Sequence, residues 1–562
     1  PGINYRLADL LLENEDFLDA AQEYERTAYT YDAHDKSSAA GYAAVYAYRQ
    51  ELDVATGARQ REVKEATVDS SLRFADAYPE HEEAPVVLGA AADDLYEMKD
   101  FPRAIQSAQT LVERYPASDP DLRRSAWAVV AHSSIDIAEF QDAEFAYTNV
   151  LRLTPEDDES RPAVIDGLAA AIYKQAEQAN LLEDYRAAAG HFLRIKSVAP
   201  TSTIRSSAEY DAAAALMKLE DWVEASDVLE EFRTCHPDHE LNSDATKQLA
   251  FIYREDGQTA RSAAEHERIA AEATDVELGR EALLLAAELY DEVPVIDDAI
   301  RVYEQYVDDY PRPLDIAMET RSRLSEIYHE QSDYQRYFDE LNEMIEEDRN
   351  AGSDRTDRSR FLASKAALTL VEREYEQFAR LELTQPFEES LALKQESMDK
   401  TLASLEGLVS YEVADVTAAA TYYIAQVYLN FSASLLDSER PTGLTAAEMN
   451  SYEMVIEEEA YPFEEQGIVV HEQNFELLAS GIYNPWVQKS LNSLADLMPG
   501  RYAKNESSEG FVGAVEVYAY RMPIAPVSPI GGEDGVDVSQ TEAPAEETKG
   551  RVVLSRNAGD DQ

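Results

Sequence analysis

Apolar residues recur along this chain with the period of an α-helix. One segment places them at i, i+3, i+4 and i+7 spacing on a single helical face, formed by Trp127, Val130, Ala131 and Ser134. A second stripe runs from Ala143 to Val150, and Pro155 follows it. Proline cannot continue a helix and biases the preceding residue away from helical geometry, so it ends the second helix. The segment therefore predicts two antiparallel helices, which we call helix A and helix B.

This unit repeats over residues 1–350 with a period of about 37 residues. Its mark is an alanine followed by a proline twelve residues later, which occurs at Ala104/Pro116, Ala143/Pro155, Ala188/Pro200, Ala225/Pro237 and Ala299/Pro311. Pro79 fits the series with Thr67 in the alanine place, and Thr274 stands where one proline is missing. Two-helix repeats of this length stack into a solenoid, and we expect roughly eight or nine pairs.

The unit resembles the tetratricopeptide repeat (TPR). One copy carries the pattern of large and small residues at Leu88, Ala91, Ala92, Leu95, Ala104, Ala108 and Pro116. Another carries it at Leu283, Ala286, Ala287, Tyr290, Ala299, Tyr303 and Pro311. The helix pair expected from about 315 to 348 lacks both the alanine and the proline. The resemblance implies an all-α fold, a right-handed α-solenoid of antiparallel helix pairs.

The repeat signature is lost after residue 350. Gly352 predicts a helix stop, and three long helices are then expected at about 358–384, 387–410 and 413–437. Further on, Thr445 and Glu448 form a capping box that starts another helix. The sequence thus predicts a TPR-like solenoid (1–350), a long-helix extension (351–437), a C-terminal helical module with the strand-like segment FVGAVEVYAY (438–522) and a disordered acidic tail (523–562).

The C-terminal module carries a second resemblance. Its runs EEEAYPFEEQGI, HEQN and YNPWVQKSLNSLADLMPGRY resemble the carboxy-terminal module of large bacterial cell-envelope TPR proteins, which are associated with gliding motility or with ExbB/TolQ-type proton-driven motors. This resemblance implies a periplasmic or outer-membrane-associated scaffold. It also implies that components of a proton-driven motor are possible partners. A cytoplasmic TPR adaptor or co-chaperone is the alternative. The chain starts at Pro1 inside a helical pattern, so we expect an upstream region whose signals would separate the two.

Charge narrows the range of partners. The 562 residues carry a net charge of −62, which repels the phosphate backbone, so we expect no nucleic acid. Only 13 of the 49 basic residues are lysines, and the acids are spread along the chain, a combination that suggests adaptation to high salt. No stretch approaches 18 consecutive apolar residues, so no membrane insertion is expected. Cys235 is the sole cysteine, which excludes an internal disulfide.

The sequence contains no convincing motif for catalysis or for ligand binding. No phosphate-binding, dinucleotide-binding or hydrolase-elbow motif occurs. His471 and Glu472 begin a zinc-protease pattern, but Phe475 occupies the place of the second ligand, and we expect a solvated helical histidine. Cys235, His236 and His239 cluster at the end of a repeat helix, where three such ligands could hold a transition metal, but these residues are also ordinary at a helix end. We therefore expect no enzyme activity, no cofactor and no metal.

The remaining candidate is a surface for a protein partner. Helix A of each pair is expected to line the concave side of the solenoid and to form a groove there. The repeat register assigns to this groove Asp93, Tyr96, Glu97, His132, Asp136, Tyr173, Glu177, Tyr210, Lys218, Glu288 and Asp291. Tyrosine offers apolar area with a polar tip, and carboxylates attract cations. We expect a basic or partly apolar segment of a partner protein to bind, although any single residue of the set could serve solubility alone.

Overall fold

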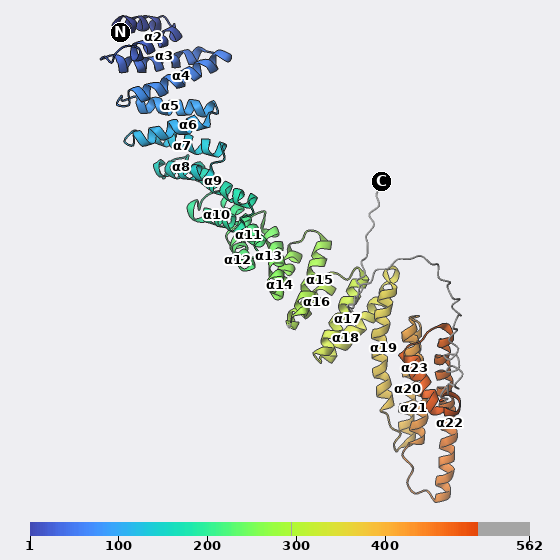
Figure 1. Cartoon of the computed structure of the whole chain (residues 1–562). Coiled ribbons are helices and arrows are strands. Elements are labelled where there is room, and N and C mark those ends of the chain that lie inside the picture. The colour runs from blue at the N-terminus through green and yellow to red at the C-terminus, as the bar shows by residue number, and fades with distance from the viewer. Residues whose placement is uncertain (294, 504–562) are drawn as a thin grey trace, which may run out of the picture. The chain divides into compact units, whose positions relative to one another are not determined.

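The computed structural model describes residues 1–293 and 295–503, and all regular structure in them is helical (Figure 1). An all-α fold is thereby confirmed. The strand-like segment FVGAVEVYAY and the predicted acidic tail lie outside the described residues. None of the described helices combines the length and the hydropathy that a bilayer-crossing segment needs.

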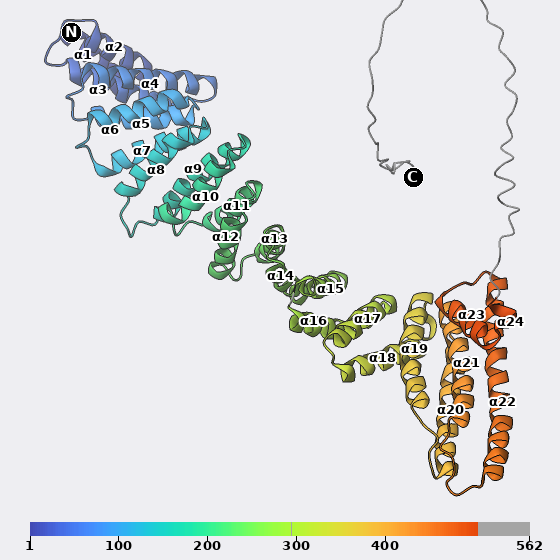
Figure 2. The same ribbon diagram turned by 60° about the horizontal axis from the view of Figure 1, so that its bottom comes forward.

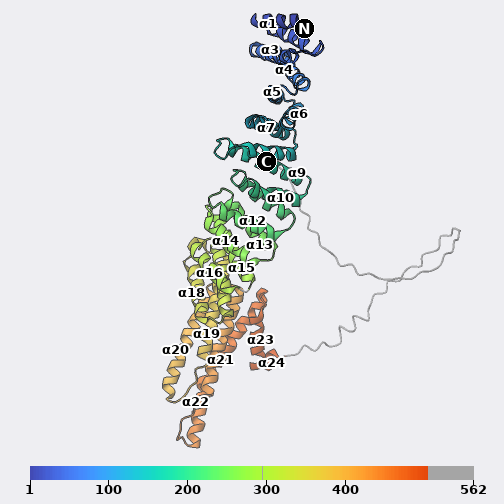
Figure 3. The same ribbon diagram turned by 90° about the vertical axis from the view of Figure 1, so that its left-hand side faces the viewer.

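Within the described residues, the chain up to residue 350 forms nine helix pairs, in agreement with the predicted repeats. The pairs are α1 (Gly2–Glu13) with α2 (Phe17–Tyr29), α3 (Ser37–Val54) with α4 (Ala58–Ala77), α5 (Ala84–Glu97) with α6 (Phe101–Arg114), α7 (Pro120–Asp136) with α8 (Phe140–Leu153), α9 (Arg161–Leu181) with α10 (Tyr185–Val198), α11 (Arg205–Lys218) with α12 (Trp222–Cys235), α13 (Asn242–Glu255) with α14 (Thr259–Glu272), α15 (Val276–Glu292) with α16 (Ile296–Asp309) and α17 (Leu314–Glu330) with α18 (Tyr334–Asn350). Each helix packs on the next one in the chain (Figures 1 and 3).

The turn from helix A to helix B has a recurring construction. A residue with positive φ breaks the first helix, and an aspartate then caps the second helix by accepting a backbone N–H three residues on. Lys99 has a φ of 65°, and the Asp100 side chain accepts from the backbone N–H of Arg103. Glu183 and Glu220 have the same left-handed backbone before Asp184 and Asp221. In the pairs that have it, this short turn holds the two helices antiparallel.

The repeat prolines end helix B as predicted. Helix α6 ends at Arg114, two residues before Pro116, and α8 ends at Leu153, two residues before Pro155. Helix α14 ends at Glu272, two residues before Thr274, which stands in the place of the repeat proline. The turn therefore forms without the proline. The repeat alanines are fully buried where helices cross, among them Ala104, Ala131, Ala143, Ala286, Ala287 and Ala299. Their lack of bulk lets the backbones approach closely.

Longer helices follow the pairs. After a short 3₁₀ turn at Gly352–Asp354 come α19 (Asp357–Ala379), α20 (Phe387–Val409), α21 (Ala414–Leu436), α22 (Ala446–Glu476), the 3₁₀ turn Leu477–Ser480, α23 (Pro485–Leu497) and α24 (Pro499–Tyr502). Helix α21 packs against α19, α20 and α22 (Figure 2). The chain divides after Ser490 into two compact units. The predicted boundaries at residues 350, 437 and 522 stay predictions.

Helix α19 ends five residues earlier than the sequence predicted. The backbone after it is drawn into other hydrogen bonds, since Glu439 donates its backbone N–H to the Leu383 carbonyl at 2.9 Å. A buried lysine also caps the end of the helix: Lys394 Nζ donates to the carbonyl oxygen of Leu381 at 2.8 Å and to Asn430 Oδ1 at 2.9 Å. Burial lowers the pKa of Lys394 to about 8. Sequence patterns did not identify this internal ammonium group.

The excess of acidic residues predicts a response to salt. We expect the melting temperature of the chain to rise between 0.1 M and 1 M NaCl, because the Debye length falls from about 10 Å to about 3 Å and the repulsion among 111 acidic side chains weakens. Surface ion pairs weaken as well, but 49 basic side chains can pair with fewer than half of the acids. Differential scanning calorimetry measures the effect. A constant or falling melting temperature would contradict the hypothesis of salt adaptation.

Candidate protein-binding surface

All of the predicted groove residues lie on A helices. We use the name A-face for the solvent-facing surface of the A helices α5, α7, α9, α11, α13, α15 and α17. Helices A of neighbouring pairs also touch directly, since α5 contacts α7 and α9 contacts α11. The predicted residues do not gather at one point. They form separate clusters along the A-face, and most of these clusters connect one A helix to the next.

The first cluster joins α5 to α7. The rings of Tyr96 and His132 lie 6.0 Å apart, and the Tyr96 hydroxyl hydrogen-bonds to Asp136. Burial, followed by the negative charge of Asp136, raises the pKa of Tyr96. Burial also lowers the pKa of His132, whose ring lies 5.8 Å from that of Tyr147. At neutral pH the cluster therefore presents a neutral imidazole, a phenol and one carboxylate.

The acids of α5 differ in their pairing. The Asp93 residue is largely exposed, but its carboxyl group is partly desolvated by its neighbours; this desolvation first, and then the negative charges of Asp94 and Glu97, raise the pKa of Asp93. Glu97 forms an ion pair with Lys64 of α4, which also lies 3.5 Å from Asp94. Asp93 is consequently better placed than Glu97 to bind a cationic side chain of a partner protein.

Two further tyrosines link the A helices in the middle of the chain. The hydroxyl of Tyr173 on α9 donates to Asp211 on α11, and burial together with this hydrogen bond raises the pKa of Tyr173. Tyr210 on α11 accepts from Gln248 Nε2 on α13 at 2.5 Å. Both tyrosines are half-buried, so part of each ring still faces outward.

The remaining predicted residues have mixed surroundings. Glu177 pairs with Lys174 at 2.6 Å on the same helix, and Lys218 is exposed at the end of α11. Asp291 accepts two hydrogen bonds from Arg323, from Nε at 2.7 Å and from Nη2 at 3.0 Å. Glu288 is largely exposed, but partial desolvation of its carboxyl group, followed by the negative charges of Glu292 and Asp291, raises the pKa of Glu288. Asp291 thus connects α15 to α17 and carries little free charge.

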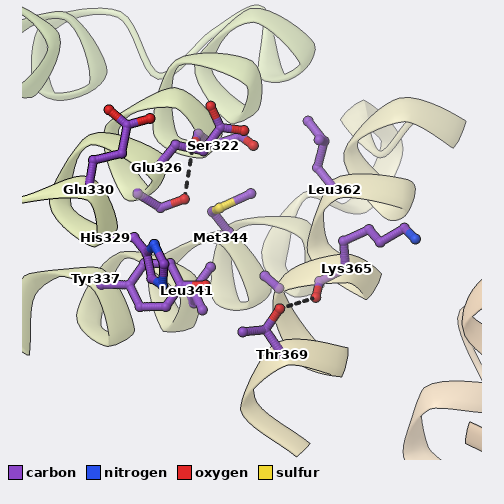
Figure 4. Close-up of a pocket in the computed structure, with 12 residues that line it drawn as sticks. Ser322, Glu326, His329, Glu330, Tyr337, Leu341, Met344, Leu362, Lys365 and Thr369 are labelled. Carbon is purple, nitrogen blue, oxygen red and sulfur yellow. Dashed lines mark hydrogen bonds between the residues drawn. The ribbon is translucent and has the colours of Figure 1, made fainter. Parts of the chain in front are cut away.

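Sequence reasoning missed a pocket between α17, α18 and α19 (Figure 4). It has a volume of about 290 Å³ and an apolar floor made of Leu341, Met344, Leu362 and Ala366, all buried. Glu326 and Glu330 stand on the α17 side, and Lys365 stands on the α19 side. His329 packs its ring 5.0 Å from that of Tyr337. The pocket can hold an apolar side chain between walls of opposite charge.

The sequence feature that could have indicated this pocket is the absence of the repeat alanine from the pair α17 and α18. Tyr337 comes four residues after the helix cap Asp333, as Ala104 comes four residues after Asp100. An alanine at this position lets the two helices of a pair approach closely, whereas a tyrosine ring holds open the space beside it. The hydroxyl of Ser325 donates to the backbone oxygen of Ser322, and the pocket shows no arrangement for nucleophilic catalysis.

The candidate metal ligands have other roles in the structure. His236 Nε2 lies 3.0 Å from Glu209 Oε2, and His239 Nδ1 accepts from the backbone N–H of Leu241. Cys235 is exposed. Across residues 1–293 and 295–503, no three histidine, cysteine, aspartate or glutamate side chains come together as a metal site would require.

The prediction of a solvated His471 was wrong. Its side chain is fully buried where α22 meets α21 and α23. Gln426 Nε2, which can only donate, lies 3.1 Å from His471 Nε2, so Nδ1 carries the proton and donates to Ser490 Oγ at 3.1 Å. Burial lowers the pKa of His471 to about 4. Gly467 explains the packing, because a Cβ there would lie 2.7 Å from the Leu429 side chain of α21.

The sequence matches no family model and no curated protein. Solved structures similar to parts of it include a tetratricopeptide repeat protein from Parabacteroides merdae, with 13% identity, coverage of 50% of this chain and 97% of that chain, and a TM-score of 0.21. The C-terminal part of a TPR repeat-containing protein from Cytophaga hutchinsonii has 17% identity, coverage of 49% and 97%, and a TM-score of 0.26. The TPR2AB domain of yeast Sti1 in a complex with pHSP90 has 16% identity, coverage of 49% and 99%, and a TM-score of 0.22.

The helix pairs themselves define the class of fold. Their two-helix unit, their recurring turn and the alanines at their crossings make the chain a TPR-like α-solenoid followed by longer helices.

Proposed function

We propose that the chain is a non-enzymatic scaffold that binds a protein partner along the A-face. The observation that supports this proposal is the set of half-buried tyrosines and of carboxylates on α5, α7, α9, α11 and α15, together with the pocket between α17, α18 and α19. Inter-helix hydrogen bonds hold the tyrosine rings in place before a partner arrives, which lowers the entropic cost of binding. The apolar floor of the pocket offers a place for one large side chain.

The charge of the A-face selects the partner. Asp93, Asp136 and Glu288 are exposed carboxylates on α5, α7 and α15. Together with the net charge of −62 they attract a basic, partly apolar segment and repel an acidic one. Added salt should slow the association, since the attraction is electrostatic.

We further propose a setting in the bacterial envelope. The resemblance of residues 457–468 and 483–502 to envelope TPR proteins supports a periplasmic or outer-membrane-associated position, with components of a proton-driven motor among the partners. A cytoplasmic adaptor or co-chaperone is the competing proposal. The coding sequence upstream of Pro1 discriminates between them, because a signal peptide or lipoprotein signal there favours the envelope.

Binding should depend on the three tyrosine rings. We expect the combined replacement of Tyr96, Tyr173 and Tyr210 by alanine to weaken binding of the partner by at least about 2 kcal/mol. Rigid aromatic anchors contribute much of the binding free energy of an interface. The measurement is a Kd for a partner captured by the full chain from the native envelope fraction and then purified.

Two control variants make this test specific. The matched replacement by phenylalanine keeps the rings and should keep most of the affinity, even where the hydrogen bonds to the next helix are lost. Replacement of the exposed Tyr31, which follows α2 and lies outside the A-face, by alanine should leave the Kd unchanged. If the first alanine variant retains every partner with unaltered affinity, binding lies elsewhere on the chain.

A further inference from the structure

A second pocket lies between the C-terminal ends of α18 and α20 and the middle of α19. Its volume is about 500 Å³, larger than that of the pocket shown in Figure 4. Cavities of roughly 300–1,000 Å³ commonly hold small organic ligands. No A helix lines this second pocket, so it is separate from the A-face.

Part of the lining is apolar. Ala367 and Val371 of α19 and Leu408 of α20 are buried in the core that the long helices share. Ile345 of α18 packs against that core and also against the core formed with α17. This part of the lining suits a hydrocarbon chain or ring, which loses its contact with water there.

The polar part of the lining is built around a fixed arginine. Arg355 Nε and Nη2 lie 2.9 and 2.7 Å from Asp348 Oδ2. Asp348 is 1% exposed, and its Oδ1 accepts from Ser359 Oγ at 2.8 Å. The ion pair occupies one edge of the guanidinium, and Arg355 Nη1 has no hydrogen-bond partner in the part of the chain that the structure describes. The buried carboxylate therefore holds Arg355 with Nη1 still able to donate.

Two more donors lie close to Arg355. Arg349 has a side chain that is 67% exposed, and its nearest carboxylate oxygen is that of Glu346, at 3.9 Å. Burial first, and then the charge of Asp348, raises the pKa of Tyr411, whereas the charges of Arg349 and Arg355 lower it. The Tyr411 hydroxyl is therefore protonated at neutral pH and lies near both guanidinium groups.

The charge of this lining is opposite to that of the whole chain. Asp348 is the one acidic residue that lines the pocket, and Arg355 already neutralises it. The whole chain has 111 acidic residues and 49 basic ones. We propose that this pocket binds a small amphiphilic anion, a carboxylate or a phosphate monoester on an apolar chain or ring. The anion accepts hydrogen bonds from Arg349, Arg355 and Tyr411, and its apolar body lies against α19.

The glycine at position 407 leaves the pocket open. Ser404, Gly407 and Leu408 line it at i, i+3 and i+4 spacing, so position 407 of α20 faces the pocket. A Cβ at Gly407 would meet nothing within 4 Å. Close packing therefore does not require glycine there, although glycine weakens the interior of a helix. A larger side chain at this position would occupy the open volume.

Isothermal titration calorimetry of the full chain with octanoate, octyl phosphate and octanol tests the proposal. High salt in the buffer screens the general repulsion between the two anions and the net charge of −62. We expect at least one of the anions to bind at least about tenfold more tightly than octanol, because hydrogen bonds to charged groups are the stronger ones. The anion that binds more tightly identifies the head group.

Two variants place the binding in this pocket. Gly407→Leu fills the open volume and Arg349→Glu reverses the charge of one donor, and each should weaken the tighter anion by at least about tenfold. Both positions are exposed, so the substitutions are compatible with folding. The matched controls are Gly190→Leu in α10, where a Cβ also meets nothing within 4 Å, and Arg26→Glu in α2, where the arginine also pairs with a glutamate three residues before it. Neither control should change the affinity.

Any of three results would overturn the proposal. The first is the absence of binding by both anions. The second is an affinity for octanol equal to that for the anions, which would show that the pocket does not select a charged head group. The third is unaltered anion affinity of Gly407→Leu or of Arg349→Glu, because the anion would then bind outside this pocket or without its arginine.

Discussion

Replacement of Ala131 or Ala287 by phenylalanine lowers the free energy of unfolding by roughly 1–3 kcal/mol or more, because a ring inserted at a close helix crossing forces the helices apart. Both alanines are fully buried, Ala131 on α7 and Ala287 on α15. Urea denaturation followed by circular dichroism measures the loss.

The control for this prediction is Ala264→Phe. Ala264 is exposed on α14, so the same change in side chain alters helix propensity there but not core packing. We expect the control to change the free energy of unfolding by less than about 1 kcal/mol. Equal losses at the buried and the exposed positions would show that the crossings tolerate bulk, contrary to the fold described above.

Acid weakens the packing of α22 through His471. Its pKa is about 4 in the folded chain against an ordinary value of 6.5, so the unfolded chain binds the additional proton between these two values. The contribution to stability is complete above pH 6.5 and is lost as the pH falls towards 4. The 2.5-unit difference corresponds to a loss of about 3 kcal/mol.

The variant His471→Gln isolates this effect from that of the many carboxylates. Glutamine keeps a polar side chain of similar reach but does not titrate. We expect its free energy of unfolding to fall less steeply between pH 6.5 and 4 than that of the native chain. Parallel curves for the two proteins would mean that His471 does not take up a proton on unfolding, and that its burial is not the cause of acid sensitivity.

The repeat pattern predicted most of the fold because each of its signals acts locally. The repeat proline stands just after helix B and prevents its continuation, and the alanine twelve residues before the proline marks a helix crossing. The long helices were also found from caps and breaks such as Gly352 and Thr445. The early end of α19 was not found, because it depends on a backbone hydrogen bond between Leu383 and Glu439, which are far apart in the sequence.

The A-face shows where sequence patterns are insufficient. The register placed Tyr173 and Asp291 on A helices, but it could not show that Asp211 and Arg323 of the next helix already engage them. His471 was misread for a similar reason: polar residues on a helix usually face water, and only the contacts of α21 and α23 make this one internal. In both places the information that the sequence lacked is a partner side chain supplied by another element.

The turns and stacked contacts of the helix pairs also determine where the molecule opens first. Each helix pair from α3 and α4 to α15 and α16 is held by a neighbouring pair on both sides. In a one-dimensional array, unfolding begins by fraying at an end and spreads inward one interface at a time. Each interface between neighbouring pairs therefore acts as a separate barrier, and the array opens in steps rather than all at once.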